Sequence, residues 1–430
     1  MKNQAELSPK RIEGIRGGKV SYLLQTALFT LIALCVLGGT NDTLLAKYQV
    51  VVYSIYLVWN LSMLLYQKKS FGAFGTPFVL LASGLAIYLL AGTLFSLESA
   101  LTLRFTVYYV VYLLLIVCYE RQETYARFID LIRIVAGILA VSIIVSAILG
   151  ERFVSMFSAW LCNRDRVRLD IHYGQYSGLI GDRSFAALAM CTGVYAELAT
   201  VFSNEKIKGR NALLIMIELV AMLLTGKRIV IAMLIVGMSV TLLTNRRFNK
   251  GILKAFALLG IFAALALLLI PKTSVFLKRI LEGVGDGSFN NRTSFWKVAI
   301  NMLEEKPIFG WGIGSYLSYN FSNGTGIHQY AHNMYFQFLG ELGIVGFCAM
   351  LAFFVIPFKR TIHIVRAMNA GDRQAGKVLL FSLMAQTGFW IYGLTGYPFY
   401  NIQQGVLYAM SIAMIASVVE ERTLSYGDRS

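Results

Sequence analysis

The chain has 430 residues, of which 57% are hydrophobic and only 14% are charged, and its mean hydropathy is +0.62. A soluble globular chain carries charge on roughly 25% of its residues, so this composition excludes an ordinary soluble domain and predicts a protein solvated mainly by lipid. The net charge of +16 would also suit nucleic acid, but in a multi-pass membrane protein such an excess marks the cytoplasmic loops. We therefore predict no nucleic-acid partner.

Apolar runs long enough to cross a membrane, about 16 to 23 residues each, recur along the whole sequence. We place them at residues 21–38, 44–66, 77–97, 101–119, 128–150, 184–202, 211–225, 229–244, 252–270, 333–356, 377–396 and 402–420. The prediction is thus an all-α, polytopic membrane protein with about twelve transmembrane helices.

The distribution of Lys and Arg predicts that both termini are cytoplasmic, and the basic, polar N-terminus shows no cleavable signal peptide. Two short amphipathic helices, at 273–281 and 293–305, are expected to lie along the outer interface. The predicted parts, in chain order, are a cytoplasmic arm at 1–20, nine transmembrane helices at 21–270 with an outer loop at 151–183, a large extracytoplasmic loop at 271–332, three transmembrane helices at 333–420, and a cytoplasmic tail at 421–430.

Basic residues also gather outside, where topology alone favours few. The outer loop contributes Arg164, Arg166, Arg168 and Arg183. We interpret these arginines as candidate ligands for an anionic head group joined to sugars, with contact to anionic lipid head groups as the alternative.

The turn from Thr225 to Arg228 joins two short runs, 211–225 and 229–244. At about 1.5 Å per residue each run covers about 23 Å, less than the roughly 30 Å hydrocarbon core. We therefore expect the turn to lie below the outer surface of the membrane. Lys227 and Arg228 would be costly at that depth without an anionic or acidic partner, which makes them functional candidates.

The stretch from Asn291 to Gly346 holds most of the side chains capable of chemistry. We expect a helix that begins at Asn290 or Asn291 and stops at Pro307. Its apolar residues share one face: Phe295, Val298, Ala299, Met302 and Leu303. Arg292 would then stand on the first turn, where a guanidinium and free backbone N–H groups suit a phosphate or diphosphate.

Tyr330, His332 and Asn333 open the next apolar run. An imidazole at this water boundary, with an ordinary pKa near 6.5, is a candidate general base for a sugar hydroxyl. His328, four residues earlier, is interpreted as a bystander.

Three of the carboxylates inside predicted spans are considered for a role. We predict a structural role for Glu341, paired with a basic or a backbone group, whereas Glu197 and Glu218 have no evident partner and could be protonated, paired or part of a relay. The sequence has neither an Asp-x-Asp dyad nor a Cys/His spacing typical of zinc, so we predict no metal and no cofactor.

Three motifs occur together in the central stretch. They are Arg292 followed by Trp296 in a short helix, the turn K-P-I-F-G-W-G-I-G-S-Y at 306–316, and H-N-x-x-x-Q-x-x-x-E-x-G at 332–343. As a set they resemble the O-antigen ligase and O-antigen polymerase family of bacterial membrane glycosyltransferases. The family also has a small-residue turn ending in an arginine; Arg228 matches that arginine, and Lys227 stands where a small residue is expected.

The resemblance implies an inverting, metal-independent glycosyltransferase of the bacterial cytoplasmic membrane, with its active site facing outside. Its donor would be a polyprenyl-diphosphate-linked oligosaccharide, its acceptor a glycan, lipid or protein, and its other partners membrane lipids, a flippase and chain-length regulators. Arg228, Arg292 and His332 would be catalytic. The predicted substrate-binding residues are Arg164, Arg166, Arg168, Arg183, Lys227, Tyr330 and Asn333.

The richness of the chain in Lys, Ile, Asn and Tyr suggests an AT-rich genome and a single-membrane bacterium, which lacks a lipopolysaccharide core. The absence of such a core as acceptor favours a polymerase of lipid-linked repeat units over a ligase. The ligase remains the alternative. A polysaccharide flippase or transporter is a further alternative, disfavoured because the two halves of the sequence show no repeat.

Overall fold

The computed structural model describes residues 16–40, 42–67, 75–204, 209–245, 288–368 and 372–427. Three predictions fall outside these residues: the span at 252–270, the amphipathic helix at 273–281, and most of the N-terminal arm. The rest of the predicted helices can be compared directly.

The described chain is helical, with one isolated β-bridge between Thr43 and Leu161. Before the central stretch, the helices are α1 (Arg16–Gly38), η1 (Leu44–Lys47), α2 (Gln49–Gln67), α3 (Thr76–Ala91), η3 (Gly92–Leu94), α4 (Ser99–Val117), α5 (Gln122–Leu149), α6 (Glu151–Met156), α7 (Arg164–His172), η4 (Gly178–Ile180), α8 (Arg183–Asn204), α9 (Gly209–Leu224) and α10 (Ile229–Thr244). They are followed by α13 (Ser288–Glu305), α14 (Tyr316–Asn323), α15 (Met334–Arg366), α16 (Arg373–Gly393), η5 (Pro398–Tyr400) and α17 (Ile402–Gly427).

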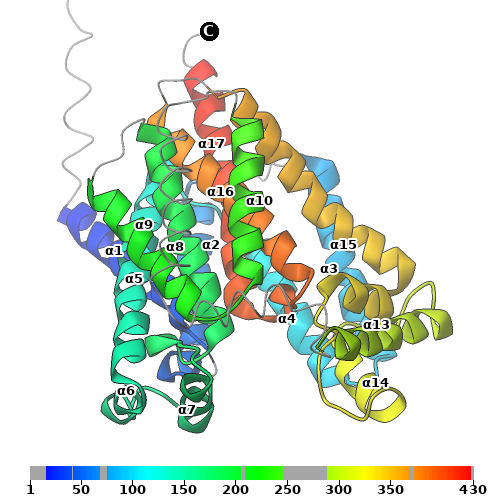
Figure 1. Ribbon diagram of the computed structural model, residues 1–430. Coiled ribbons are helices and arrows are strands. Elements are labelled where there is room, and N and C mark those ends of the chain that lie inside the picture. The colour runs from blue at the N-terminus through cyan, green and yellow to red at the C-terminus, as the bar shows by residue number, and fades with distance from the viewer. Residues whose placement is uncertain are drawn as a thin grey trace, which may run out of the picture.

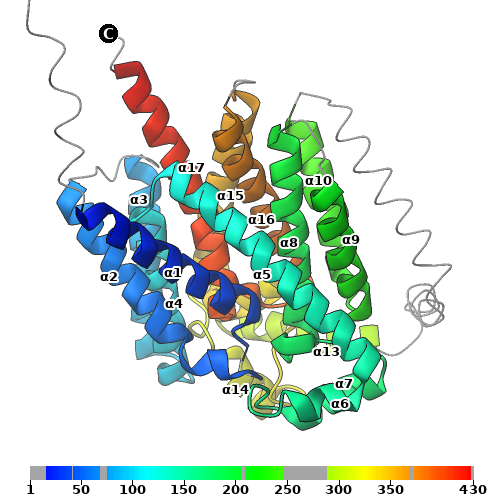
Figure 2. The ribbon, with the colours of Figure 1, turned by 90° about the vertical axis from the view of Figure 1, so that its left-hand side faces the viewer.

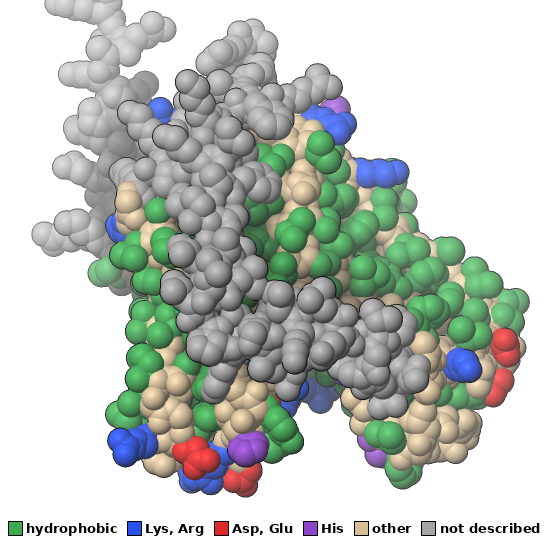
Figure 3. All heavy atoms as spheres, in the orientation of Figure 1, with side chains coloured by type: hydrophobic (Ala, Val, Ile, Leu, Met, Phe, Trp, Pro, Cys, Tyr) green, Lys and Arg blue, Asp and Glu red, His purple; other side chains and the backbone are tan. Residues whose placement is uncertain are grey.

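The all-helical prediction is confirmed for the described residues, but the count of twelve spans is not. Six helices are long and apolar enough to cross a membrane, namely Thr76–Leu94, Ser99–Val117, Gln122–Leu149, Arg183–Ser203, Met334–Arg366 and Ile402–Glu421. Shorter apolar helices cover Leu23–Gly38, Gln49–Ser62 and Ile229–Thr244. In Figure 3, the coloured surface between the two ends of the molecule is mostly hydrophobic, and most charged side chains lie towards those ends. This pattern is typical of a multi-pass membrane protein.

Helix α16 lies at the centre of the bundle, where it packs against α8, α10, α15, α17 and α5. The short helices α6, α7, α13 and α14 all lie at one end of the molecule, opposite the end of α17 (Figures 1 and 2). We call this the site end. The bundle therefore carries its irregular, polar segments together on one side.

Buried ionic groups tie α5 to its neighbours. Arg133 on α5 donates from Nε and Nη2 to the two carboxylate oxygens of Glu197 on α8, at 2.8 and 3.0 Å, and Asn211 on α9 donates to the same carboxylate at 2.7 Å. Glu197 thus has the partners that its sequence did not reveal. Both carboxyl oxygens of Glu218, by contrast, are buried and have no hydrogen-bond partner among the described residues.

Candidate functional site

A turn rich in glycine fastens the site end to α15. Helix α15 is interrupted at Gly343, whose φ is 61°. The backbone N–H groups of Ile344 and Val345, which lie just beyond that break, donate to the carbonyls of Pro307 and Ile308 at 2.8 and 3.2 Å. A helix break frees such N–H groups, and here they join α15 to the K-P-I-F-G segment of the turn.

Glu341 holds the second half of this turn. Its buried carboxylate accepts from the backbone N–H groups of Gly314 and Tyr316, at 2.7 and 3.0 Å, and from the hydroxyl of Tyr400 at 2.6 Å. Gln337 adds a fourth donor at 3.2 Å. Glu341 was predicted to pair with a basic or a backbone group, and its pairing with backbone groups is confirmed. The turn and helix motifs are therefore joined to each other.

Helix α13 packs on α15 through an apolar face. Phe295, Val298, Ala299 and Met302 are buried together, as their spacing predicted, and α13 ends at Glu305, two residues before Pro307. Its start differs from the prediction. The helix is already formed at Ser288, so Asn290 and Asn291 lie inside it and Arg292 stands in its second turn. The expected anion site between Arg292 and the N–H groups of the first turn is therefore wrong, because Arg292 does not stand on that turn.

His332 and Arg292 line one pocket of about 390 Å³, which we call the histidine pocket. The backbone of His332 lies in the left-handed region, with φ 50°, two residues before α15 begins. Gln329 Nε2 lies 2.7 Å from His332 Nε2. When the Gln329 amide donates to this nitrogen, the nitrogen is unprotonated, as in a neutral imidazole.

The electrostatic surroundings of His332 favour the same form. Burial, together with the positive charges of Arg292 and Lys227, lowers the pKa of His332 to about 4. A neutral imidazole at pH 7 can accept a proton from a hydroxyl group.

The charge of Lys227 acts on His332 in this pocket, and Lys227 is itself affected by Asp170 on α7 and Arg183 at the start of α8. It lies in the turn between α9 and α10, which are each 16 residues long, as short as predicted. Burial lowers the pKa of Lys227 to about 8, and the charges of Arg183 and Arg292 add to this effect. Arg183 Nε lies 3.5 Å from a carboxylate oxygen of Asp170. The positive charges of Arg183 and Arg292 are thus both close enough to Lys227 to lower its pKa.

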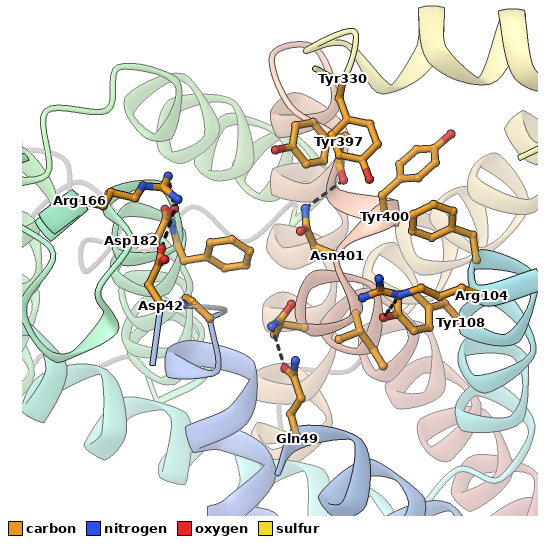
Figure 4. A pocket seen from close by; sticks show the side chains of 15 residues that line it. Asp42, Gln49, Arg104, Tyr108, Arg166, Asp182, Tyr330, Tyr397, Tyr400 and Asn401 are labelled. Carbon is orange, nitrogen blue, oxygen red and sulfur yellow. Dashed lines mark hydrogen bonds and ion pairs between the residues drawn. The ribbon is translucent and has the colours of Figure 1, made fainter. Parts of the chain in front are cut away.

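A second pocket, of about 270 Å³, opens beside the first. We call it the tyrosine pocket. Figure 4 shows Arg166, Asp42 and Asp182 on one side of it, and Tyr330, Tyr397, Asn401, Arg104 and Tyr108 on the other. The remaining lining residues are Thr40, Gln49, Phe105, Phe185, Tyr400, Ile402 and Gln403.

The structure places the residues predicted as site residues in different surroundings. His332 and Arg292 line the histidine pocket, and Lys227 and Arg183 contribute charge near it. Arg166 and Tyr330 line the tyrosine pocket. Arg164 and Arg168 lie on the surface of α7, where Arg164 donates to the Ser158 carbonyl at 3.0 Å and Arg168 pairs with Asp165 at 3.3 Å; neither lines the two pockets. Asn333 caps α15 by accepting from the N–H groups of Tyr335 and Phe336, and Arg228 is the half-buried residue that precedes α10.

Several pocket residues were missed in the sequence. Asp42 and Asp182 are buried carboxylates that both bind Arg166, at 3.2 and 2.7 Å. The only signal for Asp182 was its place directly before Arg183 at the start of an apolar run. Tyr397 and Asn401 follow α16 at a Pro-containing turn and carry no recognisable motif.

The fold and the site define a class: an all-helical, multi-pass membrane protein with a basic, histidine-containing site at one end of its bundle. Residues 212–351 match the family model described as O-antigen ligase. This match covers about a third of the chain and supports the resemblance seen in the sequence to the O-antigen ligase family, a group of membrane glycosyltransferases. No curated protein matches the chain.

The lowered pKa of Lys227 predicts a pH dependence of anion binding. Below about pH 8 the side chain is charged, and as the pH rises through 8 it loses its proton. The affinity for a short-chain prenyl-diphosphate sugar, a diester whose own charge is constant in this range, should fall roughly tenfold between pH 7 and pH 9, or about 1.4 kcal/mol. Calorimetric titration at the two pH values measures this.

Lys227→Arg is the matched control, because a guanidinium stays charged throughout this range. Its affinity should be the same at both pH values. An equal fall in the variant and the wild type would assign the dependence to another group.

Proposed function

We propose that this chain polymerises polyprenyl-diphosphate-linked oligosaccharide repeat units into a polysaccharide at the outer face of a bacterial cytoplasmic membrane. The observation that carries the proposal is the pairing of a neutral, half-buried His332 with Arg292 in one pocket, with Lys227 acting on the same histidine. A base beside clustered cations is the arrangement that transfer from a diphosphate leaving group requires.

In the proposed reaction, the donor diphosphate binds against Arg292, Lys227 and Arg183, with Arg228 at the edge of the same turn. His332 takes the proton from an acceptor hydroxyl. That oxygen forms a bond to the anomeric carbon of the donor as the bond from this carbon to the diphosphate oxygen breaks, and the configuration inverts. The cations stabilise the negative charge that the diphosphate gains.

The proposed topology rests on the side of the membrane at which the site end lies. With the site end outside, the beginning of α1 and the end of α17 would both face the cytoplasm. Figure 2 supports this arrangement, since both lie towards the end opposite α6, α7, α13 and α14. The loops at 151–183 and 271–332 would then be extracytoplasmic.

The test is turnover of a lipid-linked repeat unit by the purified full chain in lipid nanodiscs. A ladder of longer lipid-linked products supports the polymerase. Release of glycan onto an added lipid or protein acceptor, without a ladder, would replace it with the ligase. Movement of intact donor across vesicles without new glycosidic bonds would overturn both.

Replacing Arg292 should impair use of the donor. Arg292→Gln removes a charge that stabilises the leaving diphosphate, and we expect kcat/KM for the lipid-linked donor to fall roughly 10²- to 10³-fold. Arg292→Lys keeps the charge but loses the planar fork, so it should recover only part of this loss.

Lys297→Gln is the matched control on the same helix. Lys297 is exposed and lies outside the histidine pocket, and its replacement should leave kcat/KM unchanged. An equal loss in both variants would mean that the general charge of α13, and not Arg292, supports the reaction.

A further inference from the structure

The two pockets of the site end differ in charge. Three cations act on the histidine side, Lys227, Arg183 and Arg292, and Arg183 is paired with Asp170. The tyrosine pocket has two cations and two carboxylates in its lining: Arg166 and Arg104, and Asp42 and Asp182. One region is therefore positive, and the other is balanced.

The balance in the tyrosine pocket is fixed by geometry. Arg166 bridges both carboxylates, at 3.2 Å to Asp42 and 2.7 Å to Asp182, and Asp182 also accepts from the backbone N–H groups that begin α8. Because the guanidinium of Arg166 is already engaged, it has little capacity left for a diphosphate. Apart from Arg104, this pocket therefore offers little to a second anionic group.

The remaining groups of the tyrosine pocket are those that bind sugars. The rings of Tyr330 and Tyr397 lie 4.3 Å apart and offer flat apolar faces. Among the lining amides, Gln403 donates to Gln49 at 2.7 Å and Asn401 donates to the carbonyl of Tyr397 at 3.1 Å. The amide oxygens of Asn401 and Gln403 remain as acceptors, and the NH₂ group of Gln49 remains as a donor. Sugar rings present both apolar C–H faces and arrays of hydroxyl groups, so aromatic rings and side-chain amides complement them.

His332 lies between the two pockets. Its ring centroid is 6.2 Å from Phe295, which lines the histidine pocket, and 5.9 Å from Tyr397, which lines the tyrosine pocket. A base in this position can reach a hydroxyl group presented from the tyrosine pocket while the diphosphate lies on the other side.

We propose that the tyrosine pocket binds the terminal sugar residues of the acceptor glycan and presents their hydroxyl group to His332. This inference rests on the proposed function. With about 270 Å³, the pocket is slightly below the roughly 300 to 1,000 Å³ typical of sites that enclose a whole ligand. It therefore holds the end of a glycan and not its full length.

Arg104 and Tyr108 offer a way to test the pocket without disturbing His332. Arg104 Nε donates to the hydroxyl of Tyr108 at 2.9 Å, Arg104 is exposed, and Tyr108 is half-buried. Together they form one wall, and neither takes part in the ion pairs of Arg166. Tyr108→Ala should therefore remove part of the wall of the tyrosine pocket and leave the fold intact.

The probe is the methyl glycoside of the repeat unit of the host strain's own surface polysaccharide, which can accept a sugar but cannot donate one. We expect the full-length wild type to bind it, as measured by saturation-transfer NMR and calorimetry. Tyr108→Ala should weaken this binding at least tenfold and leave the affinity for a short-chain prenyl-diphosphate lipid unchanged. Arg292→Gln should weaken binding of the prenyl-diphosphate lipid and leave the affinity for the methyl glycoside unchanged. Arg152 is an exposed arginine of α6, and Arg152→Gln should change neither affinity.

The outcomes separate this inference from the proposed function. If the wild type makes glycan but Tyr108→Ala binds the methyl glycoside as tightly as the wild type, the acceptor pocket is overturned and the transferase stands. A loss of both ligands in Tyr108→Ala also overturns it, since the pockets would not be separate. If the glycoside binds and is lost only in Tyr108→Ala, while no glycan is ever transferred, the sugar pocket stands and the proposed transferase fails.

Discussion

Replacing His332 with alanine should reduce glycan transfer by about 10²- to 10⁴-fold, the range of a lost general base. The protein should remain folded, because the hydrogen bond between His332 and Gln329 lies at the surface of the pocket and not in the core. Transfer of a lipid-linked repeat unit measures the first effect, and the thermal transition in detergent measures the second. Near-normal transfer by His332→Ala would remove His332 from the mechanism.

His328→Ala is the matched control for this variant. His328 lies four residues earlier, is exposed, and stacks on Phe321 with ring centroids 4.1 Å apart. Its loss should not change the rate. In the wild type, a pKa of about 4 for His332 keeps the base neutral down to that pH, so the rate should show no step near pH 6.5. A step there would indicate that His332 titrates as an ordinary histidine.

Replacing Glu341 should have the largest effect on stability. Glu341→Leu leaves the N–H groups of Gly314 and Tyr316 and the hydroxyl of Tyr400 buried without an acceptor. Each such group costs about 1 to 3 kcal/mol, so we expect a loss of at least about 3 kcal/mol. The thermal transition in detergent should fall clearly, and proteolysis should open the chain near residues 306–316.

Glu341→Gln is a stricter test, because it keeps the size of the side chain and changes only its charge and one acceptor oxygen. Its amide keeps one acceptor oxygen but turns an NH₂ group towards a backbone N–H, so it should be intermediate in stability. Glu304→Gln, an exposed position on α13, is the control. A Glu341→Gln variant as stable as the wild type would show that the turn is held by its backbone contacts alone.

The long apolar runs of the sequence predicted helices well, because a segment that faces lipid must satisfy its backbone internally. The runs at 128–150 and 184–202 appear as α5 and α8, extended by a few residues. The number of membrane crossings could not be predicted in the same way. Helix α16 is long but holds buried polar groups such as Gln386 and Lys377, and hydropathy alone does not classify it as a span.

The site was predictable only where a motif concentrated its residues. His332, Arg292 and Lys227 came from local patterns. Asp42 and Tyr397 lie in two separate connections and Arg104 lies within α4, so these three meet only in the folded chain. The start of α13 was misplaced because Asn is a common capping residue, and nothing in the local sequence indicates that Asn290 and Asn291 continue a helix begun earlier. Asn333 was predicted as a substrate ligand because it follows His332 in the motif at 332–343, whereas its side chain caps the start of α15.

The shortness of α9 and α10 has a consequence for how a lipid-linked substrate arrives. Two adjacent helices of 16 residues reach about 24 Å each, so they cannot cross a hydrocarbon core of roughly 30 Å unless the bilayer thins around them. A dimple of this kind brings the level of the head groups down to Lys227. In the proposed reaction, the prenyl tail of the carrier lipid would then stay among the acyl chains, and its diphosphate would move sideways into the protein instead of upwards out of the membrane. Local membrane thickness would thereby become part of substrate capture.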